Sequence, residues 1–208
     1  QQAAPAAVEL RSITVAFGGL LALEHVDLMV EHGERLAVLG PNGAGKTTLF
    51  NVIAGDVRPT FGTVTVRGRD CTRSPSRVRP SLGVSRTYQK TRLFGGLTVE
   101  DNLYLAQTGK QRRHLAMRRT TQDAASGDVA RAVAERVWLG GHIGTKVADL
   151  SHGERRQLEI GMAIAAEPEI MLLDEPASGL SRGERERLIE MLDALPRELT
   201  LLLIEHDM

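Results

Sequence analysis

One eight-residue stretch, GPNGAGKT at 40–47, restricts the folds open to this chain more than any other feature. It matches the pattern G-x-x-x-x-G-K-[ST] at every fixed position. A short apolar run, RLAVLG at 35–40, comes before it, and KTTLFNVIAG at 46–55 follows with helical spacing. A buried strand, a glycine-rich turn and a helix in this order predict a phosphate-binding loop, because glycines let backbone N–H groups surround a phosphate without Cβ clashes.

The phosphate-binding loop gives roles to its own side chains. Lys46 is expected to reach the β- and γ-phosphates of a nucleotide, and the Thr47 hydroxyl to ligate Mg²⁺. The residues that we expect to bind the nucleotide here are Asn42, Gly43, Gly45, Lys46, Thr47 and Thr48. The alternative is a glycine-rich turn with a capping lysine, and the strand and helix on either side of the loop argue against it.

A second apolar run, IMLLDEP at 170–176, brings two carboxylates to the end of a strand. Asp174 can hold Mg²⁺ there through water. Glu175, next to it, can orient or deprotonate the attacking water. An acidic strand end that only caps the following helix is the alternative, and the phosphate-binding loop in the same chain favours the metal-binding interpretation.

Strand-like and helix-like runs alternate along the chain. Alternating or wholly apolar runs predict strands at 8–15, 25–30, 35–40, 62–68, 169–176 and 200–206. Amphipathic runs predict helices at 127–141 and at 182–196, the second ended by Pro196. The basic run at 110–119 is interpreted as a solvated helix face or a mobile loop. An α/β domain around a mainly parallel sheet follows, with a helical insertion over 88–147.

Charge and cysteine content exclude several classes of protein. Lys and Arg together number 26, as do Asp and Glu, so the net charge is zero and gives no general attraction to nucleic acid or membrane lipid. The single cysteine, Cys71, excludes a disulfide framework and fits a reducing compartment. The apolar runs are too short to span a bilayer, and the N-terminal residues lack a signal-peptide pattern. We therefore expect a soluble, cytoplasmic protein.

A second anion site is indicated at LSHGERRQLEIG, residues 150–161. A serine and a glycine stand directly before a long amphipathic run, which is typical of a helix N-terminus that holds an anion. The alternative is an ordinary capping box formed by Ser151 and Glu154, and such a cap could coexist with anion binding.

Four stretches together carry a family resemblance. PNGAGKTTL, LSHGERRQLEI, LLDEPASGL and LIEHD occur in the order, and at about the spacing, of ATP-binding cassette (ABC) ATPases, and the resemblance runs from about residue 8 to the end. Within this family, SRTYQKTRLFGGLTVEDNL at 85–103 and RSITVAFGGLLALEHVDLMV at 11–30 resemble the cassettes of branched-chain amino-acid importers. Cassettes for urea or amide import and for lipopolysaccharide export share parts of both stretches and remain alternatives.

The resemblance implies a fold, a division into domains and a function. The fold is an α/β P-loop NTPase core with a mainly parallel sheet, an N-terminal antiparallel β subdomain and an inserted helical subdomain. The core with its β subdomain is expected over 8–87 and 148–208, and the helical subdomain, which leads into the signature helix, over 88–147. Further strands are expected after Met208, so that the C-terminal end of the core is incomplete. The implied function is ATP hydrolysis that drives import through separate transmembrane permease subunits, on the inner face of the cell membrane.

In this family two cassettes pack head to tail and share their ATP. Ser151 and the backbone at Gly153 would contact the γ-phosphate of the ATP held by the phosphate-binding loop of the other subunit. The partner is a second ABC ATPase subunit, identical or different, that pairs when ATP binds. The helix N-terminus would add a favourable field for the phosphate. Two phosphate sites in one chain are thus explained by a pair of chains.

Three further residues acquire roles through the resemblance. Gln89 would touch Mg²⁺ and the attacking water, His206 would contact the γ-phosphate, and Phe17 would stack on adenine, where tyrosine is more common. Their alternatives are a polar loop residue, a structural histidine and a core phenylalanine, respectively.

Three positions depart from the commonest family pattern. The usual signature is leucine-serine-glycine-glycine-glutamine, in which His152 replaces the first glycine and Glu154 the glutamine. We expect an exposed His152 with no catalytic part. Ser181 replaces the aspartate that usually ends the loop crossing to the partner, which puts communication through that loop in doubt.

Apolar side chains follow the position of the glutamine. RLFGGLTV at 92–99 brings Leu93, Phe94 and Leu97 to the region where importers of this family dock a short helix of the membrane subunit. The alternative is that these side chains fill the core of the helical subdomain.

Other functional classes fit the sequence less well. Chromosome-maintenance ABC proteins carry a very long coiled coil between the glutamine and the signature, and the gap from Gln89 to Ser151 is too short for one. Translation ABC proteins carry two cassettes in one chain, so we expect no nucleic-acid partner. No Asn-Lys-x-Asp motif indicates a GTPase, and a small-molecule kinase needs no signature helix. A non-hydrolysing module is disfavoured by four residues, Lys46, Asp174, Glu175 and His206. The cargo, which other subunits choose, is left open.

Overall fold

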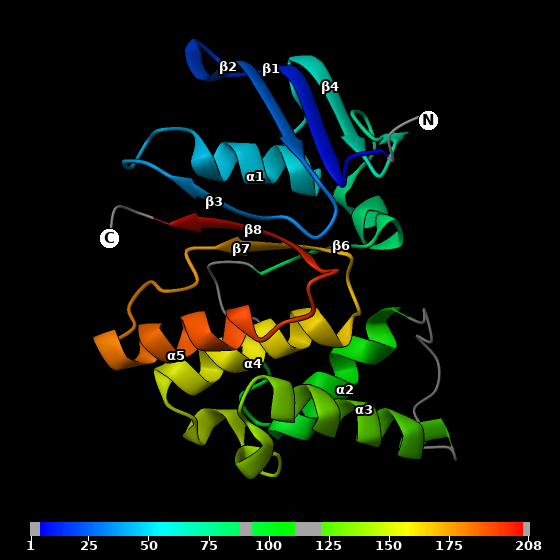
Figure 1. Cartoon of the computed structure of the whole chain (residues 1–208), viewed down its shortest axis with the longest axis vertical. Coiled ribbons are helices and arrows are strands. Elements are labelled where there is room, and N and C mark those ends of the chain that lie inside the picture. The colour runs from blue at the N-terminus through cyan, green and yellow to red at the C-terminus, as the bar shows by residue number, and fades with distance from the viewer. Residues whose placement is uncertain (1–4, 88–92, 111–121, 206–208) are drawn as a thin grey trace. The chain divides into compact units, whose positions relative to one another are not determined.

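The chain forms two groups of residues that make most of their contacts internally. The computed structural model, drawn in Figure 1, describes residues 5–87, 93–110 and 122–205. The first group, here called the sheet unit, consists of residues 1–86, 168–176 and 196–208. The second group, here called the helical unit, consists of residues 87–167 and 177–195. The domain boundaries that the sequence suggests, at 88 and 147, stay a prediction.

The sheet unit contains an antiparallel sheet with the strand order β2-β1-β4-β5. Its strands are β1 (Val8–Phe17), β2 (Leu20–Val30), β4 (Phe61–Val66) and β5 (Arg69–Asp70). β1 and β2 form a hairpin whose turn consists of Gly18 and Gly19, because Phe17 pairs directly with Leu20. The prediction that this second strand begins at residue 25 was wrong, since a turn of two glycines lets the returning strand start at once.

A second sheet of the same unit has the strand order β3-β8-β7-β6, and every neighbouring pair in it is parallel. Its strands are β3 (Arg35–Leu39), β6 (Val84–Arg86), β7 (Ile170–Asp174) and β8 (Thr200–Glu205). β7 is buried along its whole length, which explains its continuous apolar sequence. The predicted α/β architecture with a mainly parallel sheet and an antiparallel β subdomain is therefore confirmed.

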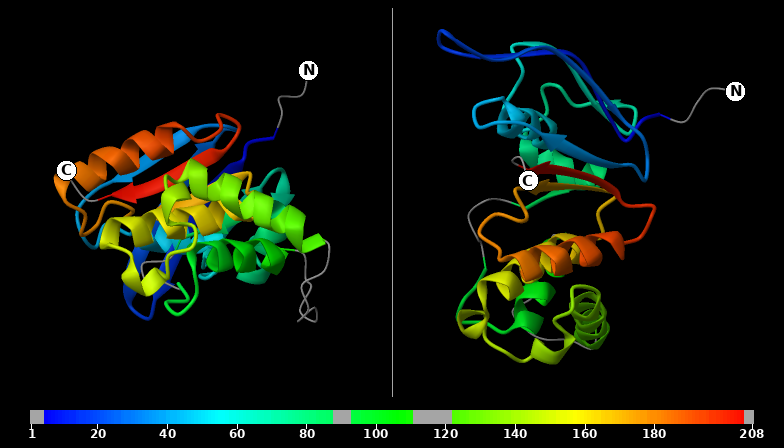
Figure 2. Two further views of the ribbon diagram at one scale, coloured as in Figure 1. Left: turned by 90° about the horizontal axis from the view of Figure 1, so that it is seen from below. Right: turned by 60° about the vertical axis from the view of Figure 1, so that its left-hand side comes forward.

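The helix α1 (Lys46–Ala54) lies between the two sheets of this unit, as the views in Figures 1 and 2 agree. Its buried side chains Phe50 and Ile53 belong to one apolar cluster with residues of β1, β4, β7 and β8. Arg79, a buried residue of the 3₁₀ helix η1 (Ser76–Leu82), donates to the Ile53 carbonyl at 2.7 Å. These contacts fix α1 within the sheet unit, and with it the position of the loop that precedes the helix.

The helical unit contains, within its described residues, four α-helices and two short 3₁₀ helices. These elements are α2 (Val99–Lys110), α3 (Gln122–Arg136), η2 (Gly140–His142), η3 (Val147–Asp149), α4 (His152–Ala165) and α5 (Arg182–Asp193). Helices α2, α3 and α4 pack against one another, as both views in Figure 2 also show. Gly161 of α4 permits this close packing, because a Cβ atom there would lie 3.1 Å from Val137 and 3.2 Å from Leu103.

Two of the helices that the sequence predicts in this unit end earlier than expected. α3 ends at Arg136, before Trp138, which has a left-handed backbone with a φ of 58°. α5 ends at Asp193, because Pro196 disfavours a helical conformation at the residue before it. The basic run at 110–119 lies almost wholly outside the described residues. Among the helices of the described segments, none is long and apolar enough to cross a membrane.

Candidate functional site

The loop between β3 and α1 depends on glycines that other residues would strain. Gly43 and Gly45 have φ angles of 83° and 86°, in the left-handed region. A Cβ atom on Gly45 would lie 2.6 Å from the Ala22 carbonyl oxygen and 2.8 Å from the Leu23 side chain. Gly45 is also the N-cap of α1, so the first N–H groups of the helix are directed to the loop. The backbone is thus shaped to receive an anion.

Lys46 lies within this loop. It is only 7% exposed, and its Nζ donates to the Gly40 carbonyl and, at 2.9 Å, to the Pro41 carbonyl. The ammonium group is therefore held by the loop rather than free in solvent. Asn42 and Thr47 of the same loop are exposed. A phosphate that enters here meets backbone N–H groups, a positive charge and a hydroxyl.

The carboxyl end of β7 carries the two predicted acidic residues. Asp174 ends the strand and is 2% exposed. Its Oδ2 accepts a hydrogen bond of 2.9 Å from Nη2 of Arg86, the last residue of β6. Glu175 follows with a φ of 49°, and its N–H donates to the Ile204 carbonyl at 3.0 Å. A glutamate in this left-handed conformation is strained, and strained residues of this kind cluster at functional sites.

Oxygen donors suited to a hard cation are present in the sheet unit. The Thr47 hydroxyl and the Asp174 carboxylate are of the kind that Mg²⁺ prefers. Within the described segments, no three His, Cys, Asp or Glu side chains gather into a group that could hold a metal ion. This sparse set fits Mg²⁺, which usually keeps several waters and binds through one or two protein groups together with the phosphates of a substrate.

Two predicted catalytic residues, Gln89 and His206, lie outside the described residues, so their roles stay predictions. Phe17 is described: it ends β1 and is 51% exposed. It is therefore not a core phenylalanine, which was the alternative to stacking on adenine. Thr48 is half-buried in the first turn of α1.

In the helical unit, Ser151 caps α4. Its Oγ accepts from the Glu154 N–H at 3.3 Å, and its own N–H donates to Glu154 Oε2 at 2.7 Å, so the capping box is confirmed. The hydrogen bond from the Ser151 backbone is the main reason why the pKa of Glu154 lies below its ordinary value. His142, whose Nε2 lies 3.3 Å from Glu154 Oε1, lowers this pKa further. Gly153 lies in the first turn, where the helix dipole favours an anion.

A second capping box begins α5. The Ser181 N–H and hydroxyl donate to Glu184 Oε2 at 2.8 and 2.6 Å, and Ser181 Oγ accepts from the Glu184 N–H at 3.4 Å. These Ser181 contacts, together with a backbone hydrogen bond from Gly153, hold the pKa of Glu184 below its ordinary value. Ser181 therefore caps α5, and Glu184 reaches from α5 to the start of α4.

A surface pocket of the helical unit opens at these two helix starts. Its lining includes Ser151, Gly153, Gln157, Glu184 and Arg187. His152 is exposed, and its ring lies beside Gly179, where a Cβ atom would be 3.2 Å from Nε2. The pocket offers an anion the N-terminus of a helix and the guanidinium groups of Arg156 and Arg187, while the carboxylates of Glu154 and Glu184 oppose it.

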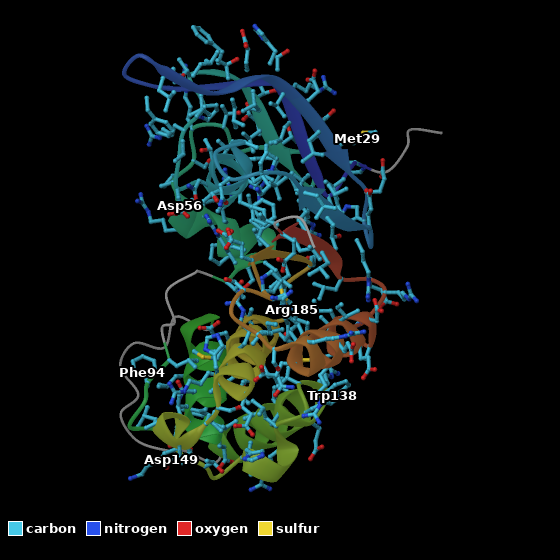
Figure 3. The ribbon with its side chains drawn as sticks, turned by 90° about the vertical axis from the view of Figure 1, so that its left-hand side faces the viewer. Met29, Asp56, Phe94, Trp138, Asp149 and Arg185 are labelled. Atoms are coloured by element: carbon cyan, nitrogen blue, oxygen red, sulfur yellow. The ribbon has the colours of Figure 1, made fainter. Side chains whose placement is uncertain are left out.

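The turn before α2 presents two apolar side chains to solvent. Phe94, labelled in Figure 3, is 52% exposed and Leu97 is 37% exposed, whereas Leu93 is half-buried. Buried Asn102 holds the turn, because its Nδ2 donates to the carbonyls of Phe94 and Thr98 at 3.2 and 2.9 Å. Its Oδ1 accepts from the Phe94 N–H at 2.9 Å. Phe94 and Leu97 therefore do not fill the core of this unit.

Three residues of these sites have no role in the sequence prediction. Glu184 could have been found, because S-x-x-E at 181–184 repeats the capping-box pattern. The signal for Asn102 is a polar side chain on the side of α2 that is otherwise apolar. Arg86 offered a weaker signal, a charged residue among the small and apolar residues just before Gln89.

The class of protein follows from the sheet unit. A parallel strand, a glycine-built loop with a lysine folded into it, a helix, and an acidic end on another strand of the same sheet define a P-loop nucleotide-binding protein. Residues 23–178 match the family described as ABC transporter. The chain belongs to this family, as an ATP-binding cassette.

Relatives of known description match nearly the whole chain. It is 39% identical over 209 residues to the high-affinity branched-chain amino acid transport ATP-binding protein LivG of Salmonella typhimurium, covering 96% of this chain and 81% of LivG. The protein of the same description from Pseudomonas aeruginosa, BraF, is 37% identical over 215 residues, covering 97% of this chain and 82% of BraF.

A solved structure supports the fold. The crystal structure of the ADP conformation of MJ1267, an ATP-binding cassette of an ABC transporter, matches with a TM-score of 0.85 at 26% identity, covering 98% of this chain and 82% of that chain. The family resemblance and the fold class predicted from the sequence are confirmed. Cassettes of this family are ATPases that act with permease subunits of a transporter and form dimers.

Proposed function

We propose that this chain is the ATP-hydrolysing subunit of an importer for branched-chain or related amino acids. The observation that carries the ATPase part is the glycine-built loop around Lys46, in the same unit as Asp174 and Glu175. The cargo part is supported by the likeness to LivG and BraF over almost the whole chain.

The sheet unit binds ATP through its loop. The phosphates lie against the N–H groups at the start of α1, and the Lys46 ammonium exchanges its carbonyl contacts for oxygens of the β- and γ-phosphates. The exposed ring of Phe17 stacks on the adenine. Thr47, together with Asp174 through water, would hold Mg²⁺, and the metal would supply positive charge at the phosphates.

Hydrolysis depends on the carboxylate next to Asp174. Glu175 orients the attacking water and accepts its proton as the water oxygen bonds to the γ-phosphorus and the bond from that phosphorus to the β–γ bridging oxygen breaks, which releases ADP and phosphate. The hydrogen bond from its N–H to the Ile204 carbonyl fixes the backbone from which this side chain extends. Gln89 assists at the water and the metal, and His206 contacts the γ-phosphate.

A second cassette completes each site. Ser151 and the Gly153 N–H of one subunit meet the γ-phosphate of the ATP that is bound to the loop of the other. Phe94 and Leu97 contact a transmembrane permease subunit, and a cassette that binds there acts as a peripheral protein on the inner face of the cell membrane. The energy of ATP binding and hydrolysis thereby reaches the permease.

Reconstitution in liposomes tests this function. The chain would be assembled with permease and binding-protein subunits identified by sequencing the neighbouring genes, and uptake of radiolabelled leucine would be compared with uptake of urea. We expect leucine uptake that needs ATP and is lost in Glu175→Gln. Uptake of urea without leucine would overturn the cargo part, and an assembled complex that does not hydrolyse ATP would overturn the ATPase part.

A further inference from the structure

Arg86 is a buried cation to which the proposed function gives no role. It ends β6, where it pairs with Leu172 in the parallel register, and its side chain is 7% exposed. Its Nη2 donates to Asp174 Oδ2 at 2.9 Å. Its Nη1 donates to Asn51 Oδ1 at 2.6 Å and to Asp56 Oδ2 at 3.1 Å. One guanidinium thus joins a strand end to a residue of α1 and to a residue of the turn that follows this helix.

The contact with Asp174 matters because that carboxylate is buried. Its side chain is 2% exposed, whereas Asp56, labelled in Figure 3, is 31% exposed. A buried carboxylate is costly unless a cation and hydrogen bonds compensate for the lost water, and Arg86 provides both. Because Arg86 holds Oδ2, rotation of the carboxylate about its Cβ–Cγ bond is restricted. The orientation of Asp174 therefore depends on Arg86.

The other two contacts lie at the far end of α1. Asn51 belongs to the helix, and Asp56 follows it, with its N–H donating to the Asn51 carbonyl at 2.8 Å. The same helix begins with Lys46 and Thr47 at the phosphate-binding loop. Arg86 thus connects the helix that carries Thr47 to the strand that carries Asp174.

We infer that Arg86 is a positioning residue, which sets the Asp174 carboxylate and the helix bearing Thr47 in the arrangement that holds Mg²⁺ on the nucleotide. It acts through Asp174 and α1 rather than directly on the metal or the nucleotide. The planar fork of arginine makes these contacts together, and the single ammonium group of lysine would keep the charge but only part of the geometry. The inference rests on the proposed function, in which Thr47 and Asp174 hold the metal.

Binding of a non-hydrolysable ATP analogue tests the role of Arg86 without any measurement of turnover. Titration calorimetry would give its affinity with Mg²⁺ and with EDTA, and the ratio of the two reports the contribution of the metal. Loss of a partner that orients a metal ligand typically costs 10- to 100-fold in metal affinity. Arg86→Met should therefore lower this ratio by about tenfold, with little change in the affinity for the analogue measured in EDTA. Arg86→Lys should lower it less.

Two further variants separate the possible causes. Asp56→Asn is the matched control, because it weakens the anchor on α1 and leaves the contact between Arg86 and Asp174 in place. An equal fall of the ratio in Asp56→Asn and Arg86→Met would overturn the inference, since the contact between Arg86 and Asp174, which Asp56→Asn keeps, would then contribute nothing to metal binding. An unchanged ratio in both Arg86 variants, with a lowered ratio in Asp174→Asn, would overturn the inference while the proposed function stands.

The remaining outcome concerns the metal site itself. An unchanged ratio in Asp174→Asn would overturn the metal-binding role of Asp174, and with it the inference. Urea unfolding of each variant identifies any that does not fold. Arg86→Lys keeps the positive charge beside Asp174, so the test remains decisive if Arg86→Met is unfolded.

Discussion

A Cβ atom on Gly153 would lie 2.5 Å from Oε1 of Glu184, closer than real Cβ contacts come. The Glu184 carboxylate therefore lies against the start of α4 at a point where only a glycine leaves room for it. The helix N-terminus that is proposed to receive the phosphate of a partner subunit already contacts a carboxylate of its own unit, which is held there by Ser181.

Gly153→Ala should move Glu184 without unfolding the protein. The obstructing atom is the end of a flexible side chain, which can swing aside, and alanine is better than glycine within a helix by about 1 kcal/mol. The two effects oppose each other, so the free energy of unfolding in urea should change by less than about 1 kcal/mol. In a Glu184→Ala background, Gly153→Ala should raise the free energy of unfolding. An equal change in both backgrounds would show that positions 153 and 184 are not coupled.

Acid should weaken both capping boxes. The pKa of Glu154 is lowered mainly by the Ser151 backbone N–H and that of Glu184 mainly by the Ser181 hydroxyl. A carboxyl with a lower pKa in the folded state takes up its proton more readily when unfolded, so its contribution is complete at neutral pH and is lost as the pH falls below about 4.3. The double variant Glu154→Gln/Glu184→Gln should lose less unfolding free energy than the wild type as the pH falls through this range, measured by urea unfolding at each pH. The control is Glu190→Gln, on the exposed face of α5, which should behave as the wild type does.

Lys46→Ala should lose both nucleotide affinity and turnover. The Lys46 ammonium is held within the loop by carbonyl oxygens, and a fixed charge in such a place is worth several kcal/mol to a phosphoryl-transfer transition state. Titration calorimetry with ATP measures the affinity. Lys146→Ala, which removes an exposed lysine of the helical unit, is the control. Unchanged nucleotide binding by Lys46→Ala would remove this residue from the site.

Glu175→Gln should reduce ATP turnover by about 10²- to 10⁴-fold, the usual range for general acid–base catalysis, and leave ATP binding nearly intact. Glutamine keeps the size of the side chain and the left-handed backbone but cannot accept the proton of the water. Glu167→Gln is a matched control, because Glu167 is exposed and has a similar φ of 46°. Turnover near that of the wild type would exclude Glu175 as the base.

Local signals explain how much of this protein can be predicted from its sequence. The loop at 40–47 and the strand ending at Asp174 are marked by glycines and continuous apolar runs, which are visible within a few residues. The contacts of Arg86 cannot be recognised from its neighbours in the sequence, because its partners Asn51 and Asp174 are 35 and 88 residues away along the chain. β6 is also too short, at three residues, for a periodic pattern.

Contacts between separate helices were equally hidden. Each capping box is a local pattern of four residues, but the reach of Glu184 to Gly153 arises only when α4 and α5 pack with their N-termini together. The exposure of Phe17 could not be predicted either, because an aromatic residue at the end of a strand faces solvent or core according to the neighbouring elements.

The signature residues should act only between two chains, so pairing should depend on ATP. Ser151 is exposed at the N-terminus of α4, where it already caps its own helix. The interface is expected to be polar and to form around the bound phosphates, so the chain should be largely monomeric without nucleotide. Glu175→Gln, by slowing hydrolysis, should keep the γ-phosphate in place and let the pair accumulate. Without its permease subunits the pair should still be weak.

Adding Ser151→Arg to Glu175→Gln should abolish this pairing, because a long side chain would occupy the space that the phosphate of the partner needs. ATP binding to the chain's own loop should persist. Ser151→Ala is the matched control: it loses the cap, at a cost of about 1 kcal/mol, but adds no bulk, so it should weaken pairing only in part. Analytical ultracentrifugation with and without ATP and Mg²⁺ measures the mass of each variant. Equal pairing with and without Ser151→Arg would contradict the proposal, since α4 would then lie outside the interface. A monomeric mass of Glu175→Gln in ATP at high protein concentration would also count against it, because the phosphate alone would then not join two chains.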